Sequence, residues 1–222
     1  MVGDQTAPLA AVLWDMDGTL VDTEPYWIAT EFALAEEYGG SWSQELALQL
    51  VGNDLITSGR FIRTHMGIDL TPEEIVERLL DGVIARVRTE VPWRPGAREL
   101  LDQLRAEGVP CALVTASYER FVAPILERLP AGSFRVVVTG DAVTRGKPDP
   151  EPYLTAARLL AVDPTECVAI EDSDTGARSA AAAGCRVLVV PHHVEVPAGE
   201  GRFFRESLVG LTPADLTARP RR

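Results

Sequence analysis

Residues 10–19, Ala-Ala-Val-Leu-Trp-Asp-Met-Asp-Gly-Thr (AAVLWDMDGT), join an uninterrupted apolar run to two carboxylates and a glycine. A short continuous apolar run, as opposed to an alternating one, is typical of a strand buried on both faces of a parallel sheet. Asp15 and Asp17 come directly after this strand, at the sheet edge where open α/β proteins bind their ligands. The stretch therefore predicts both a parallel sheet and the position of a functional site.

Similar apolar runs recur later in the chain and alternate with helical patterns. The runs are residues 109–114, 135–138, 167–170 and 186–190. The helical patterns are Pro95–Glu107, Pro150–Leu160 after an Asp149 N-cap, and Thr175–Ala183. Strands that alternate with helices predict an α/β fold, a doubly wound, Rossmann-like parallel sheet.

Residues 23–91 interrupt this alternation, because they carry helical periodicity and no convincing strand. Thr71-Pro72-Glu73-Glu74 reads as a capping box with proline at the first helical position. It opens a helix with a single apolar stripe, and Glu24–Tyr38 and Asp54–His65 also read as helices. We therefore expect an α-helical cap domain at 23–91, inserted into an α/β core formed by 1–22 and 92–222.

The bulk composition limits the partners of the protein. A formal net charge of −12 over 222 residues argues against nucleic acid or an anionic membrane surface, which both require a basic face. No apolar run approaches membrane-spanning length, and the first ten residues lack the pattern of a secretory signal. Cys111, Cys167 and Cys185 lie in apolar runs without metal-ligand spacing, as buried thiols in a reducing compartment do. We expect a cytoplasmic protein, either a monomer or a weak dimer.

Polar side chains follow the other predicted strands as well. Thr115 and Ala116 follow the second run, Glu171-Asp172 follows the fourth, and Lys147, the only lysine in the chain, comes shortly after the third. At the edge of a parallel sheet these groups share one cleft with Asp15 and Asp17. Each pair of like charges at about 4 Å costs on the order of 4 kcal/mol, so one lysine does not balance the carboxylates. The oxygen ligands predict Mg²⁺, and the cleft suits a phosphoryl group with an aspartate as nucleophile.

These motifs resemble those of the haloacid dehalogenase superfamily, in its β-phosphoglucomutase-like phosphatase branch with a helical cap. The matching segments are residues 15–25 (DMDGTLVDTEP), Thr115, Lys147-Pro148 and Glu171-Asp172-Ser173, and the likeness covers essentially the whole chain. The resemblance implies that Asp15 is the nucleophile and Asp17 the general acid and base. It implies phosphate binding by Thr115, Ala116 and Lys147. It implies a metal site formed by Asp15, Asp17 (through its backbone carbonyl), Asp172 and the nearby Glu171.

The resemblance implies a Mg²⁺-dependent phosphatase for a small phosphorylated metabolite, such as a sugar phosphate or phosphoglycolate. Substrate selection would fall to residues of the cap, and the candidates are Glu24, Trp27, Gly52 and Asn53. A sugar-phosphate mutase is an alternative, although mutases of this type typically carry a histidine where this chain has Trp27. A receiver-type phospho-accepting signalling domain is an alternative from another class, although such domains lack a helical cap.

Several polar residues near the motifs have simpler interpretations. Asp22 and Asp174 precede predicted helices and are expected to act as helix caps. His192-His193 follows the last apolar run and is expected to be a solvated pair. Ser117 is either a helix cap or a substrate contact.

Overall fold

The computed structural model describes residues 9–217. Residues 1–8, which hold most of the stretch without a secretory pattern, lie outside the described part of the chain. Within residues 9–217 no helix combines the length and the apolar character needed to cross a membrane. All three cysteines are buried and unpaired.

The core is a parallel sheet in the order β3-β2-β1-β4-β5-β6. Its strands are β1 Ala11–Trp14, β2 Cys111–Val114, β3 Val136–Val138, β4 Cys167–Glu171, β5 Arg186–Val189 and β6 Arg202–Phe204. The order reverses at β1, the topological switch point where a doubly wound sheet opens a crevice for its ligand. The predicted α/β fold is confirmed, and the first five strands match the five apolar runs to within two residues at each end.

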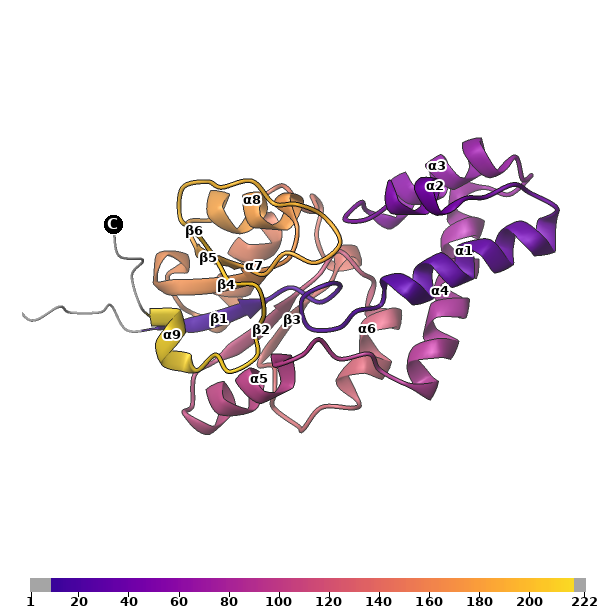
Figure 1. Ribbon diagram of the computed structural model, residues 1–222. Helices are drawn as coiled ribbons and strands as arrows, with labels where there is room; N and C mark the ends of the chain where they lie inside the picture. The colour runs from indigo at the N-terminus through magenta and orange to yellow at the C-terminus, as the bar shows by residue number, and fades with distance from the viewer. Residues whose placement is uncertain (1–8, 218–222) are drawn as a thin grey trace, which may run out of the picture.

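Helices cover both faces of the sheet (Figure 1). The covering helices are α5 Ala97–Ala106, α6 Glu119–Leu126, α7 Glu151–Leu160, α8 Asp174–Ala182 and α9 Pro213–Thr217, with 3₁₀ turns η1 Gly140–Ala142 and η2 Pro164–Glu166. Leu13 packs on one face with residues of α7 and α8, whereas Val12 and Trp14 pack on the other with α5 and α6. Successive residues of β1 thus point into two apolar layers, which accounts for its continuous apolar sequence.

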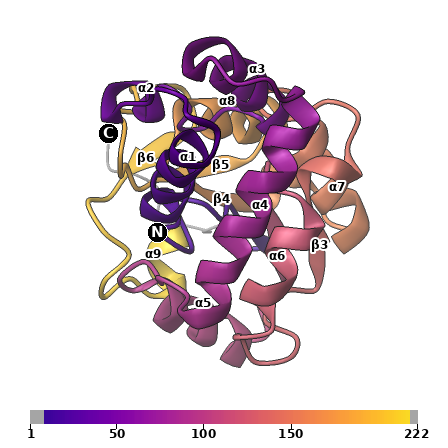
Figure 2. The ribbon, with the colours of Figure 1, turned by 90° about the vertical axis from the view of Figure 1, so that its right-hand side faces the viewer.

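Between β1 and α5 the chain forms four helices and no strand, and this part lies beside the carboxyl edge of the sheet (Figures 1 and 2). Its helices are α1 Glu24–Tyr38, α2 Gln44–Leu48, α3 Leu55–Met66 and α4 Pro72–Thr89. The predicted capping box at Thr71 and Glu74 is confirmed, and the seven apolar residues of the α4 stripe are all buried. Leu34, Ile62, Ile75 and Leu79 belong to an apolar cluster separate from the two layers on the sheet. We call residues 24–89 the helical segment.

Two helix starts differ from the sequence predictions. Asp22 does not cap α1: the N-cap is Thr23, and its side chain makes no capping bond. Asp174 is the first residue of α8, and Ser173 is the cap, since its hydroxyl accepts a hydrogen bond from the Gly176 amide. Both aspartates bind other partners, His193 for Asp22 and Arg202 for Asp174.

Candidate active site

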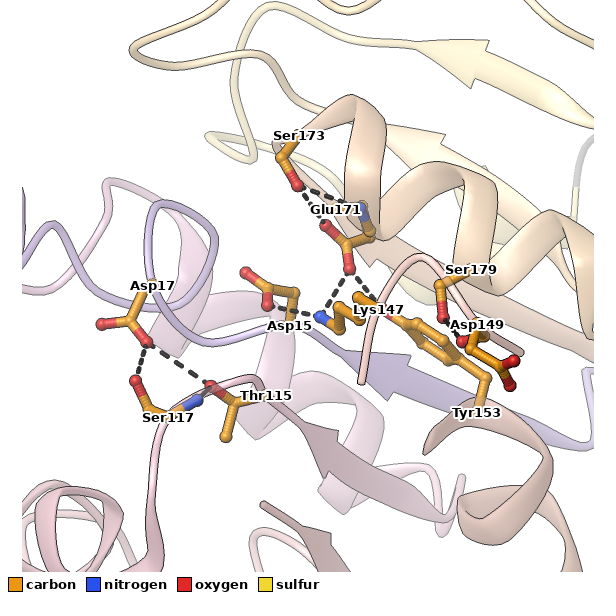
Figure 3. A network of polar contacts seen from close by, with 11 residues as sticks. Asp15, Asp17, Thr115, Ser117, Lys147, Asp149, Tyr153, Glu171, Ser173 and Ser179 are labelled. Carbon is orange, nitrogen blue, oxygen red and sulfur yellow. Dashed lines mark hydrogen bonds and ion pairs between the residues drawn. The ribbon is translucent and has the colours of Figure 1, made fainter. Parts of the chain in front are cut away.

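Segments far apart in the sequence meet at the carboxyl ends of the central strands (Figure 3). Asp15 follows β1, Thr115 follows β2, and Glu171 ends β4 with Asp172 directly after it. Lys147 reaches the same point from the loop between η1 and α7. The strand pairing of β1 with both β2 and β4 fixes this arrangement, because neighbouring parallel strands end side by side.

Lys147 is held between two carboxylates. Its Nζ lies 2.7 Å from Oδ1 of Asp15 and 2.7 Å from Oε1 of Glu171, and only 7% of its side chain is exposed. Burial alone would lower the pKa of Lys147, but the charges of Asp15 and Glu171 outweigh burial and raise it. Tyr153 closes the far side, with its hydroxyl donating to Oε1 of Glu171 and its ring 5.2 Å from the Lys147 ammonium. The site therefore holds one fixed positive charge against Asp15.

Replacing Lys147 with arginine should lower kcat by about 10²–10³-fold, the loss expected when a positioned electrostatic donor is misplaced. A planar guanidinium is bulkier than an ammonium and prefers a bidentate fork, so it does not fit between Asp15, Glu171 and the Tyr153 ring. Steady-state kinetics check this, with Arg145→Lys as a control, because Arg145 is 68% exposed two residues away. Turnover of Lys147→Arg within threefold of wild type would contradict the electrostatic role.

Asp17 is held by three hydroxyl groups. Its Oδ1 accepts a hydrogen bond from Thr23 at 2.5 Å, and its Oδ2 accepts from Ser117 at 2.7 Å and from Thr115 at 3.4 Å. Burial raises the pKa of Asp17, the hydrogen bond from Thr23 opposes it, and the charge of Asp15 adds to it. A carboxyl group with a raised pKa and a fixed orientation is suited to carry a proton.

Asp15, Glu171 and Asp172 form a buried acidic cluster whose ligand atoms lie within 4.8 Å of one another. Burial, with Asp15 and Glu171 adding their charges, holds the pKa of Asp172 well above its usual range, and burial raises the pKa of Glu171 to about 7. Oδ2 of Asp15 is buried without a hydrogen-bond partner among the described residues. An orphaned carboxylate oxygen beside two further carboxylates fits a hard divalent cation that prefers oxygen ligands.

Two glycines allow these carboxylates to approach the backbone. A Cβ at Gly18 would lie 2.0 Å from Oδ2 of Asp172, and Gly18 has a φ of +88° that disfavours a side chain. A Cβ at Gly176 would lie 2.0 Å from the Glu171 carboxylate. Both glycines are therefore required by the packing of the acidic cluster.

A cavity of about 120 Å³ lies between these strand ends and the helical segment. The cavity is lined by all four residues that the sequence analysis proposed for substrate selection, Glu24, Trp27, Gly52 and Asn53, and by Thr115 and Ala116. Trp27 also packs edge-to-face on Phe121 of α6, so it contacts the core as well as the cavity. The structure thus places the sequence-derived candidates around one space sized for a small metabolite.

Glu31 also lines the cavity, although its carboxyl group was not among the candidates predicted from the sequence. It lies on α1 seven residues after Glu24, is only 3% exposed, and its Oε2 accepts a hydrogen bond from Nε1 of Trp42 at 3.0 Å. Burial raises the pKa of Glu31 to about 8, and burial with the charges of Asp17 and Asp22 raises that of Glu24 to about 7. The side of the cavity formed by α1 therefore presents two carboxyl groups whose pKa values are raised by burial.

Glu31→Gln should stabilise the protein at pH 8, because the amide keeps an acceptor for Trp42 without a proton to lose. A carboxyl with a raised folded-state pKa costs stability as pH rises from its unfolded value near 4.5 toward about 8. Each pKa unit corresponds to about 1.4 kcal/mol, so the shift sets an upper limit of about 5 kcal/mol, and the variant should gain at least about 1 kcal/mol at pH 8 and little at pH 4. Thermal unfolding at the two pH values measures this, with the exposed Glu36→Gln as control. An equal effect at both pH values would show that Glu31 is not buried in its neutral form.

Ser117 and Thr23 are site residues whose role the sequence did not settle. The structure resolves Ser117 as a partner of Asp17, since its hydroxyl donates to that carboxylate and α6 is capped by Tyr118 without a side-chain bond. Thr23 is the N-cap of α1, but its hydroxyl donates to Asp17. Thr23 lies within the first motif and Ser117 lies two residues after Thr115, so a hydroxyl residue in or beside a motif is the one sequence signal that they share.

Comparisons with known proteins agree with this geometry. Residues 12–190 match the model of the haloacid dehalogenase-like hydrolase family. The chain therefore belongs to the haloacid dehalogenase-like hydrolase family. It is 32% identical over 195 residues to a phosphorylated carbohydrates phosphatase from Thermotoga maritima, covering 83% of this chain and 86% of that one. It is 36% identical over 189 residues to hexitol phosphatase A from Escherichia coli, covering 83% and 84%.

A solved structure is similar over nearly the whole chain. CbbY from Rhodobacter sphaeroides, in complex with phosphate, superposes with a TM-score of 0.84 at 27% identity, covering 95% of this chain and 100% of that one. The likeness extends over the sheet and the helical segment together.

Proposed function

We propose that this protein is a Mg²⁺-dependent phosphatase that hydrolyses a small phosphorylated metabolite, of the sugar-phosphate or phosphoglycolate type, through an aspartyl-phosphate intermediate. The observation that carries the proposal is the way the carboxylate of Asp15 is held. Asp15 lines the cavity, Lys147 fixes one of its oxygens at 2.7 Å, and the other oxygen has no hydrogen-bond partner among the described residues. A carboxylate oriented in this way at the cavity is placed to attack phosphorus.

In the first half of the reaction, one carboxylate oxygen of Asp15 forms a bond to phosphorus as the ester P–O bond breaks. The departing oxygen takes the proton of Asp17, which its raised pKa helps to retain until that step. In the second half, Asp17 removes a proton from water as the water oxygen attacks phosphorus, and Asp15 is released together with inorganic phosphate. Lys147 and the Thr115 hydroxyl face the phosphoryl oxygens throughout.

Asp15, Asp172 and Glu171, with the backbone carbonyl of Asp17, would hold Mg²⁺, in keeping with the orphaned Asp15 oxygen and the raised pKa values of Glu171 and Asp172. When bound, the ion supplies positive charge that offsets the repulsion between these carboxylates and the phosphoryl group.

The names of the relatives favour a sugar or sugar-alcohol phosphate among the possible substrates, since two of them act on phosphorylated carbohydrates or hexitols. The mutase alternative is less favoured, because within residues 9–217 no arginine or lysine other than Lys147 lines the cavity to hold a second phosphate. Membership of a hydrolase family and the helical segment argue against the receiver alternative. Three expectations from the sequence remain predictions: that residues 23–91 form a cap domain, that the protein is cytoplasmic, and that it is a monomer or a weak dimer.

Phosphate release from a panel of phosphorylated sugars, sugar alcohols, phosphoglycolate and nucleotides tests the proposal. We expect Mg²⁺-dependent turnover of at least one sugar or sugar-alcohol phosphate. Phosphorylation of the protein without turnover would favour the signalling alternative, and no reaction with any compound would overturn the proposal.

A further inference from the structure

Two histidines, an aspartate and an arginine form a cluster outside the proposed catalytic residues. Nδ1 of His192 lies 2.7 Å from a guanidinium nitrogen of Arg94, and Nε2 of His193 lies 2.9 Å from Oδ1 of Asp22. Nε2 of His192 lies 3.0 Å from the other Asp22 oxygen, off the line of a well-formed hydrogen bond. The two imidazole rings lie 3.9 Å apart, so the four side chains form one compact group, which we call the histidine clamp. The expectation of a solvated histidine pair holds for His193, which is exposed, but not for His192, which is half-buried between Arg94 and Asp22.

Two imidazoles and a carboxylate could also hold a metal ion, since their ligand atoms lie within 4.8 Å of one another. The arginine argues against that use. Arginine only donates hydrogen bonds, so Nδ1 of His192 must accept, and the proton of the neutral ring is then on Nε2, the atom facing Asp22. A metal ligand needs a lone pair on that atom and an acceptor opposite the other nitrogen. The cluster is therefore arranged for hydrogen bonding.

The clamp lies where the helical segment joins the core. The chain enters that segment through Asp22 and leaves it through Pro92–Arg94. The two linkers pair in an antiparallel manner, with the Asp22 amide donating to Pro92 at 2.7 Å and the Arg94 amide donating to Leu20 at 3.0 Å. His192 contacts a side chain from each linker, although it comes from the loop after β5. One histidine thus links both connections to the core.

The clamp is also connected to the proposed proton carrier. Asp22 is followed directly by Thr23, whose hydroxyl donates to Asp17 at 2.5 Å. His193 lines the same cavity as Asp17 and Glu24. A shift of the Asp22 backbone would therefore move a hydrogen-bond donor of Asp17.

We propose that His192 is a positioning residue that ties both linkers of the helical segment to the core and so keeps Thr23 against Asp17. The inference rests on the proposed phosphatase function for its effect on turnover, but the contacts themselves do not depend on it. Arg94 and Asp22 hold His192 from opposite sides, and the ring of His193 lies beside it at a tilt of 51°.

The clamp should loosen in acid. The charged and titratable groups facing His192 are Arg94 and Asp22 on the linkers and His193 on its own loop. Burial lowers the pKa of His192, Asp22 opposes this, and Arg94 and His193 add to it. Because the pKa of His192 is lower in the clamp than in water, the clamp favours the neutral imidazole and is most stable at higher pH. That preference is lost progressively as pH falls below about 6.5, because protonation places an N–H against the Arg94 guanidinium.

Three variants test the inference. His192→Leu removes both contacts, and we expect kcat to fall about tenfold or more, as a small misplacement of a catalytic group produces. His192→Gln offers an amide oxygen to Arg94 and an N–H to Asp22 without a titrating proton. It should keep kcat within about threefold of wild type and weaken the fall in activity between pH 6.5 and 5. The exposed His65→Leu on α3 is the control and should match wild type.

Hydrogen exchange gives a readout that needs no turnover. The Asp22 and Arg94 amides should exchange at least about tenfold faster in His192→Leu than in wild type or His192→Gln. If the wild-type protein hydrolyses no phosphate ester but shows this exchange pattern, the proposed phosphatase function would be rejected and the proposed role of His192 in the clamp would stand. Unchanged exchange and kcat in His192→Leu would overturn the clamp. The clamp would also be overturned, in favour of a metal site, if the wild-type protein binds one equivalent of Zn²⁺ in the presence of excess Mg²⁺ and His192→Leu does not.

Discussion

Asp15→Asn should lower phosphate release by at least about 10³-fold while leaving the protein folded, because it replaces the proposed nucleophile with a side chain of nearly the same shape. The amide oxygen of asparagine carries no charge and is a poor nucleophile toward phosphorus. Loss of the negative charge also leaves Lys147 with Glu171 as its remaining anionic partner at 2.7 Å. Initial rates on the best substrate from the panel measure the effect, and circular dichroism with thermal unfolding verifies the fold.

The matched control for this variant is Asp69→Asn, since Asp69 is an exposed aspartate of the helical segment that does not line the cavity. It should turn over at the wild-type rate. Mass spectrometry after rapid quenching should detect a phosphorylated species in wild type and none in Asp15→Asn. Turnover of Asp15→Asn within tenfold of wild type would show that another group attacks phosphorus.

Removing divalent cations should cause the second large loss of phosphatase activity. EDTA should reduce turnover to background, and added Mg²⁺ should restore it, because the carboxylates of Asp15, Glu171 and Asp172 repel one another without a cation. Because a bound cation would relieve the same repulsion, Mg²⁺ binding should also raise the free energy of unfolding. A ligand at 100 times its dissociation constant stabilises a folded protein by about 2.7 kcal/mol, which thermal unfolding detects easily.

Asp172→Asn separates the role of the ion from a general salt effect. The variant removes one charge from the cluster, so it should be more stable than wild type without metal, and Mg²⁺ should raise its Tm less. Na⁺ at equal ionic strength should leave the Tm of both proteins nearly unchanged. Full activity in EDTA, or an equal Mg²⁺ response in both proteins, would contradict a metal site at Asp172.

The α/β fold was predictable because its strands are buried on both faces, which leaves a strong local signal. The strand β6, Arg202–Phe204, was missed, since three residues at a sheet edge carry too short a pattern. The helical segment was predictable in α1, α3 and α4, but α2 has only five residues and no clear periodicity.

The candidate site was predictable where its residues directly follow a strand, as Asp15, Thr115 and Asp172 do. Lys147 does not directly follow a strand, but it was recognised as the only lysine in the chain and as part of a family motif. Residues with neither kind of signal were not recognised. Glu31 lies in the middle of a helix, where a carboxyl ordinarily faces water, and only the packing of α1 shows that it is buried. Asp22 and His192 are 170 residues apart, and no local pattern reveals that they meet.

The single buried lysine makes the protein its own spectroscopic probe. Lysine labelled with ¹⁵N or ¹³C would give one side-chain signal, from the Lys147 ammonium beside Asp15, without any need for assignment by mutagenesis. An endoprotease specific for lysine would also find only the Lys147-Pro148 bond, and proline after the cleavage site normally blocks such enzymes. Amine-directed dyes and surface immobilisation through lysine would likewise have no exposed side chain to react with among the described residues.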